Sequence, residues 1–459
     1  MAVVGGSTAG LRANRNWQRL LLGQAVSMTG DIVFGVTVML WISTVIARGE
    51  PWAPAAVAGA LVAAAVPALA IGPVAGVYVD RWNRRRTMMT ADAARALLIG
   101  ALILLPAAGH HIPPVVQVGI IYAVLAAASC FAQFFDPSRM AIIGAVVDPA
   151  DLPKASGQLQ ASAGFATIIG PPIAAPLLFV AGVQWALIIN ALSFAVSFLM
   201  LRGMRVAGSG EAVREPGASF LDEFRAGVSF FRGSPVLITL TVGVVIATLG
   251  TGALNSLLVF FVPHNLHVGA KWLGTLIEAI GVGAIAGSLL AGPAAKRVPP
   301  ARIFWLGLVL AGVALIGFSR CTTLPVAIVV IAVTGLIVGM LNSVTTPLLL
   351  GATPQHLLGR VSAVINPVQE LASISSMAVA GFLASTVLRG MHEVVVGVSF
   401  GPYDTIFAVS GLLFVIAGFA SIAPMRGAAQ PAAEATAADE GDQPGAAGLQ
   451  GPGPVSPAT

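Results

Sequence analysis

The sequence predicts an all-α membrane protein with twelve transmembrane helices in two pseudo-symmetric six-helix bundles. Three observations predict it: a hydrophobic content of 57% with only 9% charged residues, long uninterrupted apolar runs, and basic residues gathered in alternate connections. A soluble domain carries roughly 25% charged residues, and its surface needs them. Lipid is the solvent that so apolar a surface requires. A transmembrane barrel would instead show short segments of alternating polarity.

Each apolar run provides the roughly 20 residues with which a helix crosses a bilayer. The expected spans of the first half are 18–46, 54–79, 87–107, 114–135, 156–180 and 183–202. Those of the second half are 234–262, 272–295, 302–319, 323–349, 358–388 and 403–424. The chain therefore divides into an N-terminal stretch 1–17, a bundle 18–202, a linker 203–233, a bundle 234–424 and a tail 425–459.

The placement of lysine and arginine predicts the orientation. Basic connections stay on the cytoplasmic side of a membrane. With twelve spans, nearly all basic residues fall on one side, and the other side holds only Arg48, Lys271, Arg320 and Arg389. We therefore expect both termini in the cytoplasm and the protein in the cell membrane. Topology then explains the net charge of +5, so we expect no nucleic-acid partner.

The linker and the tail lie outside the expected spans. In the linker, one face of an amphipathic helix is predicted to carry Phe220, Leu221, Phe224, Val228 and Phe231. Such a helix lies along the inner membrane surface, and a partner-binding helix is the alternative. The tail is rich in Ala, Gly and Pro, which predicts disorder.

A short internal repeat relates the two halves. The stretch from Ala75 to Arg86 resembles the stretch from Ala291 to Arg302, because both carry glycine and arginine at matching positions. Both follow the second span of their half. Repeated halves around a central path are typical of transporters.

The first of these stretches contains the clearest motif. It consists of Gly76, Asp80, Arg81, Arg84, Arg85 and Arg86. The glycine lets neighbouring helices approach closely, and the aspartate can accept hydrogen bonds from arginines or a helix N-terminus. The arginines hold the connection at the inner face. Together these residues can latch the two halves, and a plain basic connection is the alternative.

With this motif the chain resembles the major facilitator superfamily, whose second connection carries a G-x-x-x-D-R-x-G-R-R pattern. Asn83 stands where the pattern has glycine, and asparagine accommodates a left-handed backbone. In span 156–180, Gly170 and Pro171 match a second family pattern, G-x-x-x-G-P-x-x-G-G, which is associated with exporters. Alanine replaces three of its glycines, and a plain packing helix is the alternative.

Other residues resemble the branch that contains enterobactin exporters and macrolide efflux proteins. They are Gln24, Gly30-Asp31, the stretch 135–139 and the stretch 359–361. The resemblance implies a monomeric secondary transporter without cofactors, whose first, fourth, seventh and tenth spans line a central path. The candidates on that path are Gln24, Tyr122, Gln133, Asn255, Phe260, Asn342 and Thr346. Their low charge favours a bulky amphiphilic or cationic compound as substrate.

Three carboxylates fall within the spans: Asp31, Glu278 and Glu370. An ionisable group costs roughly 2.5–3.5 kcal/mol at the bilayer centre on insertion scales and is usually functional. The hypothesis is that Asp31 or Glu278 exchanges the coupling proton. The alternative is a packing role, which we favour for Glu370 because Asn366 and Gln369 are close in sequence.

Asp92 and Arg95 also fall within a span, three residues apart. This spacing predicts an ion pair, with contact to the substrate as the alternative.

The leading functional hypothesis is proton-coupled export of a drug, siderophore or secondary metabolite by alternating access. A nutrient importer and a transport-inactive receptor or sensor are the alternatives. The sequence contains neither G-x-S-x-G nor H-E-x-x-H nor a Walker pattern, so we expect no enzyme activity. No spacing of Cys and His predicts a metal site.

Overall fold

The computed structural model describes residues 11, 13–79, 82–148, 151–204, 231, 233–353, 358–391, 393–395 and 398–427. Twelve helices in this part are long and apolar enough to cross a membrane. This number confirms the predicted fold class. Asp80, Arg81, nearly all of the linker and the tail beyond residue 427 lie outside the described residues.

The first half contains six long helices and several short ones. They are α1 (Arg15–Trp41) with η1 (Ile42–Ile46), α2 (Ala53–Val79), α3 (Arg84–Leu102), α4 (Leu105–Ala108), η2 (Gly109–His111), α5 (Pro114–Val146), α6 (Leu152–Pro176) with η4 (Leu177–Ala181), and α7 (Val183–Gly203).

The second half repeats the six long helices and adds a β-hairpin. Its elements are α9 (Pro235–Asn265), η5 (Ala270–Trp272), α10 (Leu273–Ala295), α11 (Pro300–Ser319), α12 (Leu324–Ala352), α13 (Leu358–Ser385), β1 (Glu393–Val395), β2 (Val398–Phe400), α14 (Pro402–Ala420) and α15 (Ile422–Gly427). The two strands pair antiparallel.

One predicted boundary was clearly wrong. The fourth span was expected to end at residue 135, before Asp136 and Pro137, but α5 continues to Val146. The apolar stretch that follows Pro137 keeps the chain helical, because neighbouring groups in a membrane bundle tolerate an internal proline. Asp136 and Arg139 therefore lie inside a transmembrane helix and not in a connection.

The two halves pack their helices in the same pattern. In the first half, α1 contacts α6 and α7, α3 contacts α5 and α7, and α2 contacts α5. In the second half, α9 contacts α13 and α14, α11 contacts α12 and α14, and α10 contacts α12. Each pair has its counterpart, which is the expected result of a structural repeat. Between the halves, α2 packs on α13 and α6 packs on α10.

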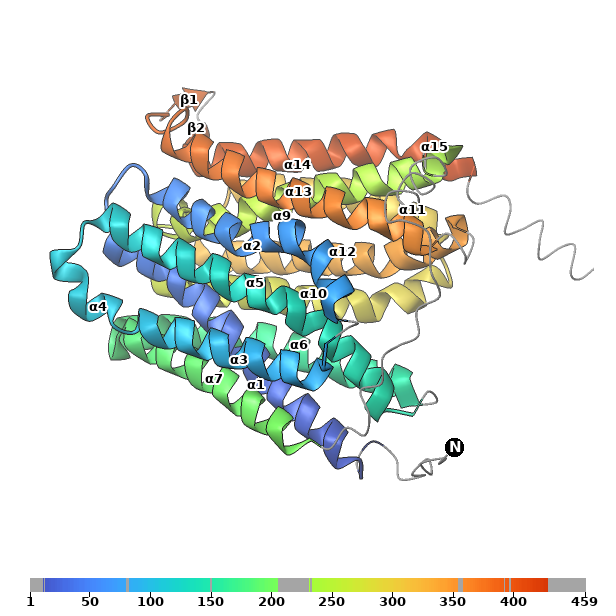
Figure 1. Cartoon of the computed structure of the whole chain (residues 1–459). Coiled ribbons are helices and arrows are strands. Elements are labelled where there is room, and N and C mark those ends of the chain that lie inside the picture. Colours follow the sequence, from blue (N-terminus) through green and yellow to red (C-terminus); the bar gives the residue numbers. More distant parts are fainter. Residues whose placement is uncertain are drawn as a thin grey trace, which may run out of the picture.

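Both ends of the described chain lie at one end of the bundle, which we call the terminal end (Figure 1). The opposite end carries β1 and β2, and we call it the hairpin end. One apolar core cluster joins the halves. In the first half, its members come from residues 33–60 and from the helices α3 to α7. All of them lie between the middle of the bundle and the hairpin end. In the second half the cluster continues to the terminal end, with Ala301, Phe304 and Met425, whereas the first half has a cluster of its own there around Trp17, and a small cluster forms around Leu237.

Contacts between the halves also lie toward the hairpin end. The backbone N–H of Ala55 donates to Ser385 Oγ at 2.9 Å, which ties α2 to α13. On the other side of the interface, α10 approaches α6 so closely that a side chain at Gly274 would collide with the carbonyl of Pro171. In the part of the chain that is described, the halves are therefore packed together at the hairpin end and have separate cores at the terminal end.

Close backbone packing inside the second half predicts one stability effect. A side chain at Gly339 of α12 would collide with the carbonyl of Ala284 in α10, whereas Gly351 of the same helix faces open space. Gly339→Leu should therefore reduce the yield of monodisperse protein in detergent several-fold, while Gly351→Leu leaves it unchanged. Fluorescence-detected size exclusion measures both. Equal yields would show that α10 and α12 do not pack as described.

Candidate functional site

An ion pair lies buried in the first half, on α3. Arg95 Nη2 lies 2.6 Å from Asp92 Oδ1. Asp92 is fully buried, and Arg95 is 7% exposed. The guanidinium lies over two rings, 4.6 Å from the centre of Phe135 and 4.4 Å from that of Phe194. Such cation–π contacts stabilise a desolvated cation, so α5 and α7 hold Arg95 in place.

The buried pair is incompletely bonded. Among the described residues, Asp92 Oδ2 and Arg95 Nε have no hydrogen-bond partner. The Ser197 hydroxyl on α7 lies beside the Asp92 carboxylate. Unsatisfied polar atoms in a buried ion pair are costly, and they call for a functional explanation.

Asp31 lies within electrostatic reach of this pair, and α1 and α7 pack closely at the neighbouring Gly30. A Cβ atom on Gly30 would lie 2.9 Å from Asn190 Oδ1, so only a glycine permits this approach. The Asn190 amide lies beside the Asp31 carboxylate, and Arg95 and Asp92 both act on its charge. The structure thus brings together a carboxylate and an ion pair that the sequence predicted as unconnected features.

The side chain of Asp31 is accessible despite its depth. It lies midway along α1, and protein atoms surround its carboxylate, yet a substantial part of the residue is exposed.

A second polar group lies nearer to the terminal end. Arg139 Nη1 donates to Gln24 Oε1 at 2.9 Å, and its Nη2 lies 3.1 Å from Asp136 Oδ1. Gln24 is buried, whereas the Asp136 side chain is 61% exposed. Gln24 and Asp31 share a face of α1, two turns or about 10 Å apart along the axis. Gln24 and Asp31 thus place two polar side chains on one face of α1.

The sequence reasoning did not select Asp136 and Arg139 as site residues. The predicted fourth span ended at residue 135, which placed both residues in the connection after it. The usable signal was the apolar run from residue 140 to residue 147, which is too long for a tight connection.

The two carboxylates of the second half have different surroundings. Glu278 lies on the face of α10 that carries Gly274 and Gly281, both of which pack on α6. It is half-buried at the contact between the halves. Glu370 is half-buried in α13. Within the described ranges neither carboxylate has an ion pair, and the structure gives no hydrogen bond from Asn366 or Gln369 to Glu370.

The structure places the candidates for the central path on several helices. Asn255 on α9 and Asn342 and Thr346 on α12 are exposed, and Gln133 is half-buried beside Gly72. The Tyr122 hydroxyl instead donates to the carbonyl of Ala56 at 2.7 Å and thereby ties α5 to α2.

Phe260 lies close to the hairpin end of α9. Its ring stacks on that of Tyr403, with the centroids 5.8 Å apart.

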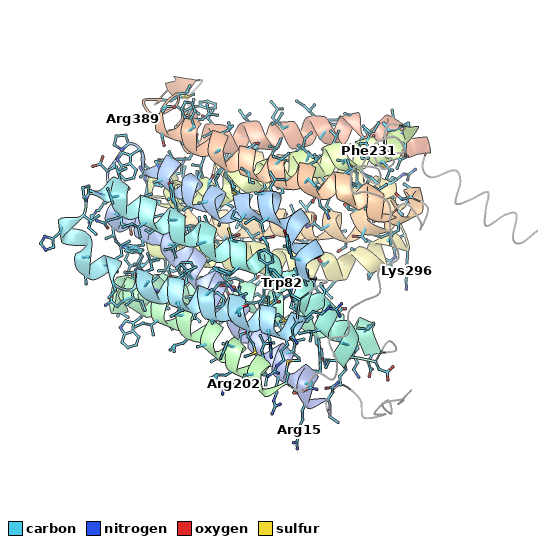
Figure 2. All side chains as sticks on the ribbon, viewed as in Figure 1. Arg15, Trp82, Arg202, Phe231, Lys296 and Arg389 are labelled. Atoms are coloured by element: carbon cyan, nitrogen blue, oxygen red, sulfur yellow. The ribbon has the colours of Figure 1, made fainter. Side chains whose placement is uncertain are left out.

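The arginine motif ties helices together within the first half. Arg85 Nε donates to the carbonyl of Leu201 at 2.8 Å, at the end of α7 close to the labelled Arg202 (Figure 2). Gly76 lies in α2, Arg84 is half-buried and Arg86 is exposed. Asn83 has φ −70° and caps α3, so the left-handed backbone considered for it was wrong.

The motif of α6 contacts two different helices. Gly170 faces Ile32 of α1, where a Cβ atom would lie 2.6 Å from Ile32 Cγ2. Pro171 faces Gly274 of α10. The motif therefore lies where α6 packs on both halves.

Twelve spanning helices in two repeats, with charges buried among them, are typical of a polytopic membrane transporter. Residues 20–377 and 240–449 match the model of the Major Facilitator Superfamily, so the chain belongs to this family. It is a transporter and not an enzyme.

Several relatives carry the names of efflux proteins. The chain is 25% identical over 393 residues to the multidrug efflux pump Tap of Mycolicibacterium fortuitum, covering 83% of this chain and 92% of the relative. It is 24% identical over 229 residues to macrolide efflux protein A of Streptococcus pyogenes, covering 49% of this chain and 54% of the relative.

Solved structures share the fold. A point mutant of the nucleoside transporter NupG superposes with a TM-score of 0.71 at 10% identity, covering 89% of this chain and 99% of that one. A bacterial homologue of the iron transporter ferroportin gives 0.70 at 15% identity, covering 90% and 98%. These similarities show the fold alone.

Proposed function

We propose that the protein is a proton-coupled exporter of a small amphiphilic compound, with Asp31 as the residue that carries the proton. The observation that supports this most is the position of Asp31, exposed beside the ion pair of Asp92 and Arg95. With Asp31 ionised, this cluster carries a net charge of −1, and one proton neutralises it. Because an uncompensated charge at this depth is costly, either a proton or a cationic substrate stabilises the cluster.

The packing of the halves supports alternating access as the mechanism. In this conformation the halves share a core at the hairpin end and have separate cores at the terminal end. We place both termini in the cytoplasm of a cell-membrane protein, and we infer that Asp31 is reached from that side in this conformation. Substrate taken up there displaces the proton, and rocking of the halves exposes Asp31 to the outside, where it is protonated again. The names of the efflux relatives support this direction.

Transport in inverted membrane vesicles tests the proposal. Vesicles that contain the protein and are energised to an acidic interior should accumulate ethidium or erythromycin, and nigericin, which collapses the pH gradient, should abolish the accumulation. Vesicles without the protein are the control. Accumulation only in right-side-out vesicles would indicate an importer, and no gradient-dependent flux with any of a panel of amphiphiles would support a receptor instead.

A further inference from the structure

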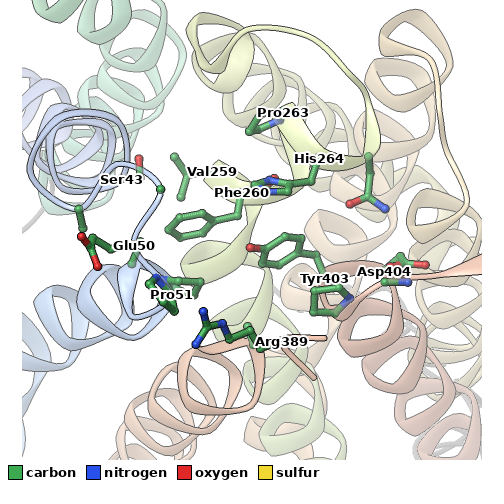
Figure 3. A pocket seen from close by; sticks show the side chains of 18 of the residues that line it. Ser43, Glu50, Pro51, Val259, Phe260, Pro263, His264, Arg389, Tyr403 and Asp404 are labelled. Carbon is green, nitrogen blue, oxygen red and sulfur yellow. Dashed lines mark hydrogen bonds between the residues drawn. The ribbon is translucent and has the colours of Figure 1, made fainter. Parts of the chain in front are cut away.

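A cavity of about 530 Å³ lies at the hairpin end, between the two halves (Figure 3). Its first-half wall consists of residues between Ser43 and Pro54, from η1, the connection that follows it and the start of α2. Its second-half wall comes from the end of α9, the end of α13 and the start of α14. Cavities of about 300–1,000 Å³ hold drug-sized molecules. The coupling site does not account for this cavity, because Asp31 lies several turns away on α1.

The second-half wall is a preformed aromatic surface. Phe260 stacks on Tyr403, and the ring of His264 lies 5.1 Å from that of Tyr403. His264 Nδ1 lies 2.8 Å from the carbonyl of Phe260, which fixes the imidazole. Aromatic rings held in this way offer a rigid surface for another ring.

The start of α14, which carries Tyr403, is fixed as well. Asp404 accepts a hydrogen bond from the N–H of Gly401 at 2.8 Å and lies 3.3 Å from Arg320 Nη2. The guanidinium of Arg320 lies 4.5 Å from the centre of the Phe400 ring. Asp404 is thus already neutralised by Arg320 and contributes no free charge to the cavity.

Two other charges on the cavity wall lack ionic partners. Glu50 belongs to the first half and Arg389 to the second, and both side chains are exposed. In the described part of the chain neither forms an ion pair, and the Glu50 carboxylate accepts a hydrogen bond from Trp52 Nε1 at 3.1 Å. Figure 3 shows them on the same side of the cavity, with Pro51 between them. Opposite charges thus face one aromatic cavity, one from each half.

We propose that this cavity binds an aromatic zwitterion of about the size of a dipeptide. The ring packs against Phe260 and Tyr403, the ammonium group binds Glu50, and the carboxylate binds Arg389. A molecule with only one of these charges leaves the charged side chain of the other half without an ionic partner.

Occupancy of this cavity changes transport, because the two walls belong to different halves. A bound zwitterion holds the halves together at the hairpin end and loses one of its partners when they separate. A ligand shifts a conformational equilibrium by its difference in affinity for the two states. Added at the hairpin side, the zwitterion therefore inhibits turnover. This consequence rests on the proposed alternating access, whereas the binding itself does not.

Binding is tested with three matched compounds on the purified full-length protein. L-tryptophylglycine is the zwitterion, its C-terminal amide is the cation and its N-acetyl form is the anion. Microscale thermophoresis should show that the zwitterion binds about tenfold more tightly than either analogue, as expected for one charged hydrogen bond. In Glu50→Gln, which lacks the partner of the ammonium group, the zwitterion should bind no more tightly than the anion. In Arg389→Gln, which lacks the partner of the carboxylate, the zwitterion should bind no more tightly than the cation.

Controls use exposed charges of the hairpin end that do not line the cavity. Arg48→Gln and Lys271→Gln should leave all three affinities unchanged, and size exclusion should show all variants folded. Equal affinities of the three compounds, or losses in the control variants as large as those in Glu50→Gln, would overturn the proposal. Binding without inhibition of transport would leave the site intact and count against alternating access, so the two failures are distinguishable.

Discussion

Asp31→Asn should abolish export driven by the pH gradient and leave exchange of substrate down its own gradient. Asparagine keeps the size and polarity of the side chain but cannot bind and release a proton. The cluster with Asp92 and Arg95 then stays permanently neutral, as if protonated, so substrate flux no longer depends on protons. In energised inverted vesicles we expect accumulation to fall at least about tenfold, whereas counterflow in liposomes without a gradient remains within about twofold of the unchanged protein.

The matched control is Glu370→Gln, which removes a half-buried carboxylate outside the cluster. It should retain energised export. Energised export that survives in Asp31→Asn would contradict the assignment. If Glu278→Gln lost energised export instead, Glu278, at the contact between α6 and α10, would be the residue that carries the coupling proton.

Cross-linking the halves at the hairpin end should stop transport reversibly. Ala55 and Ser385 are joined by a hydrogen bond across the interface of α2 and α13, so cysteines at these positions lie within reach of a short bifunctional thiol reagent. Because alternating access requires the halves to separate there, the cross-link should reduce export at least about tenfold, and a cleavable reagent should restore it on reduction. Mass spectrometry measures the cross-linked fraction, and transport is assayed on the same samples.

The experiment needs a background without native thiols. Cys130 and Cys321 are both free, and burial raises the pKa of the Cys321 thiol and so slows its reaction. Replacing both by serine removes this complication. The single variants Ala55→Cys and Ser385→Cys, treated with the same reagent, should transport normally. Full activity of the cross-linked double variant would show that the hairpin end does not open during transport.

Most of the fold could be predicted from the sequence, because lipid imposes a strong pattern on it. Every spanning helix must satisfy its backbone hydrogen bonds internally and present apolar side chains to the lipid. The sequence therefore consists of long hydrophobic runs separated by basic connections. The end of α5 could not be placed in this way, since proline is a weak stop signal in a membrane helix. The short hairpin of β1 and β2 was not predicted either, because three-residue strands are too short for a clear alternation of polar and apolar residues.

The candidate site was only partly predictable. Asp31, Asp92 and Arg95 are visible in the sequence as ionisable residues within apolar runs. Their proximity depends on α7 packing against both α1 and α3, and neither spacing nor composition encodes which helices become neighbours. Phe194 carries no signal of its role as a partner of Arg95, because phenylalanine is common in apolar helices.

The cavity at the hairpin end could not be predicted at all. Glu50 and Arg389 lie in opposite halves of the chain and face one space only after the halves have packed together. As single charges in connections, they are indistinguishable from ordinary solvated residues in the sequence.

Proton release by the purified transporter tests the coupling role of Asp31 most directly. A saturating amphiphilic substrate is added to the protein in weakly buffered detergent solution, and a pH-sensitive dye records the change. We expect the unchanged protein to release about one proton for each molecule bound, and Asp31→Asn to bind the substrate with no release. Release of as many protons by Asp31→Asn as by the unchanged protein would show that another group carries the coupling proton.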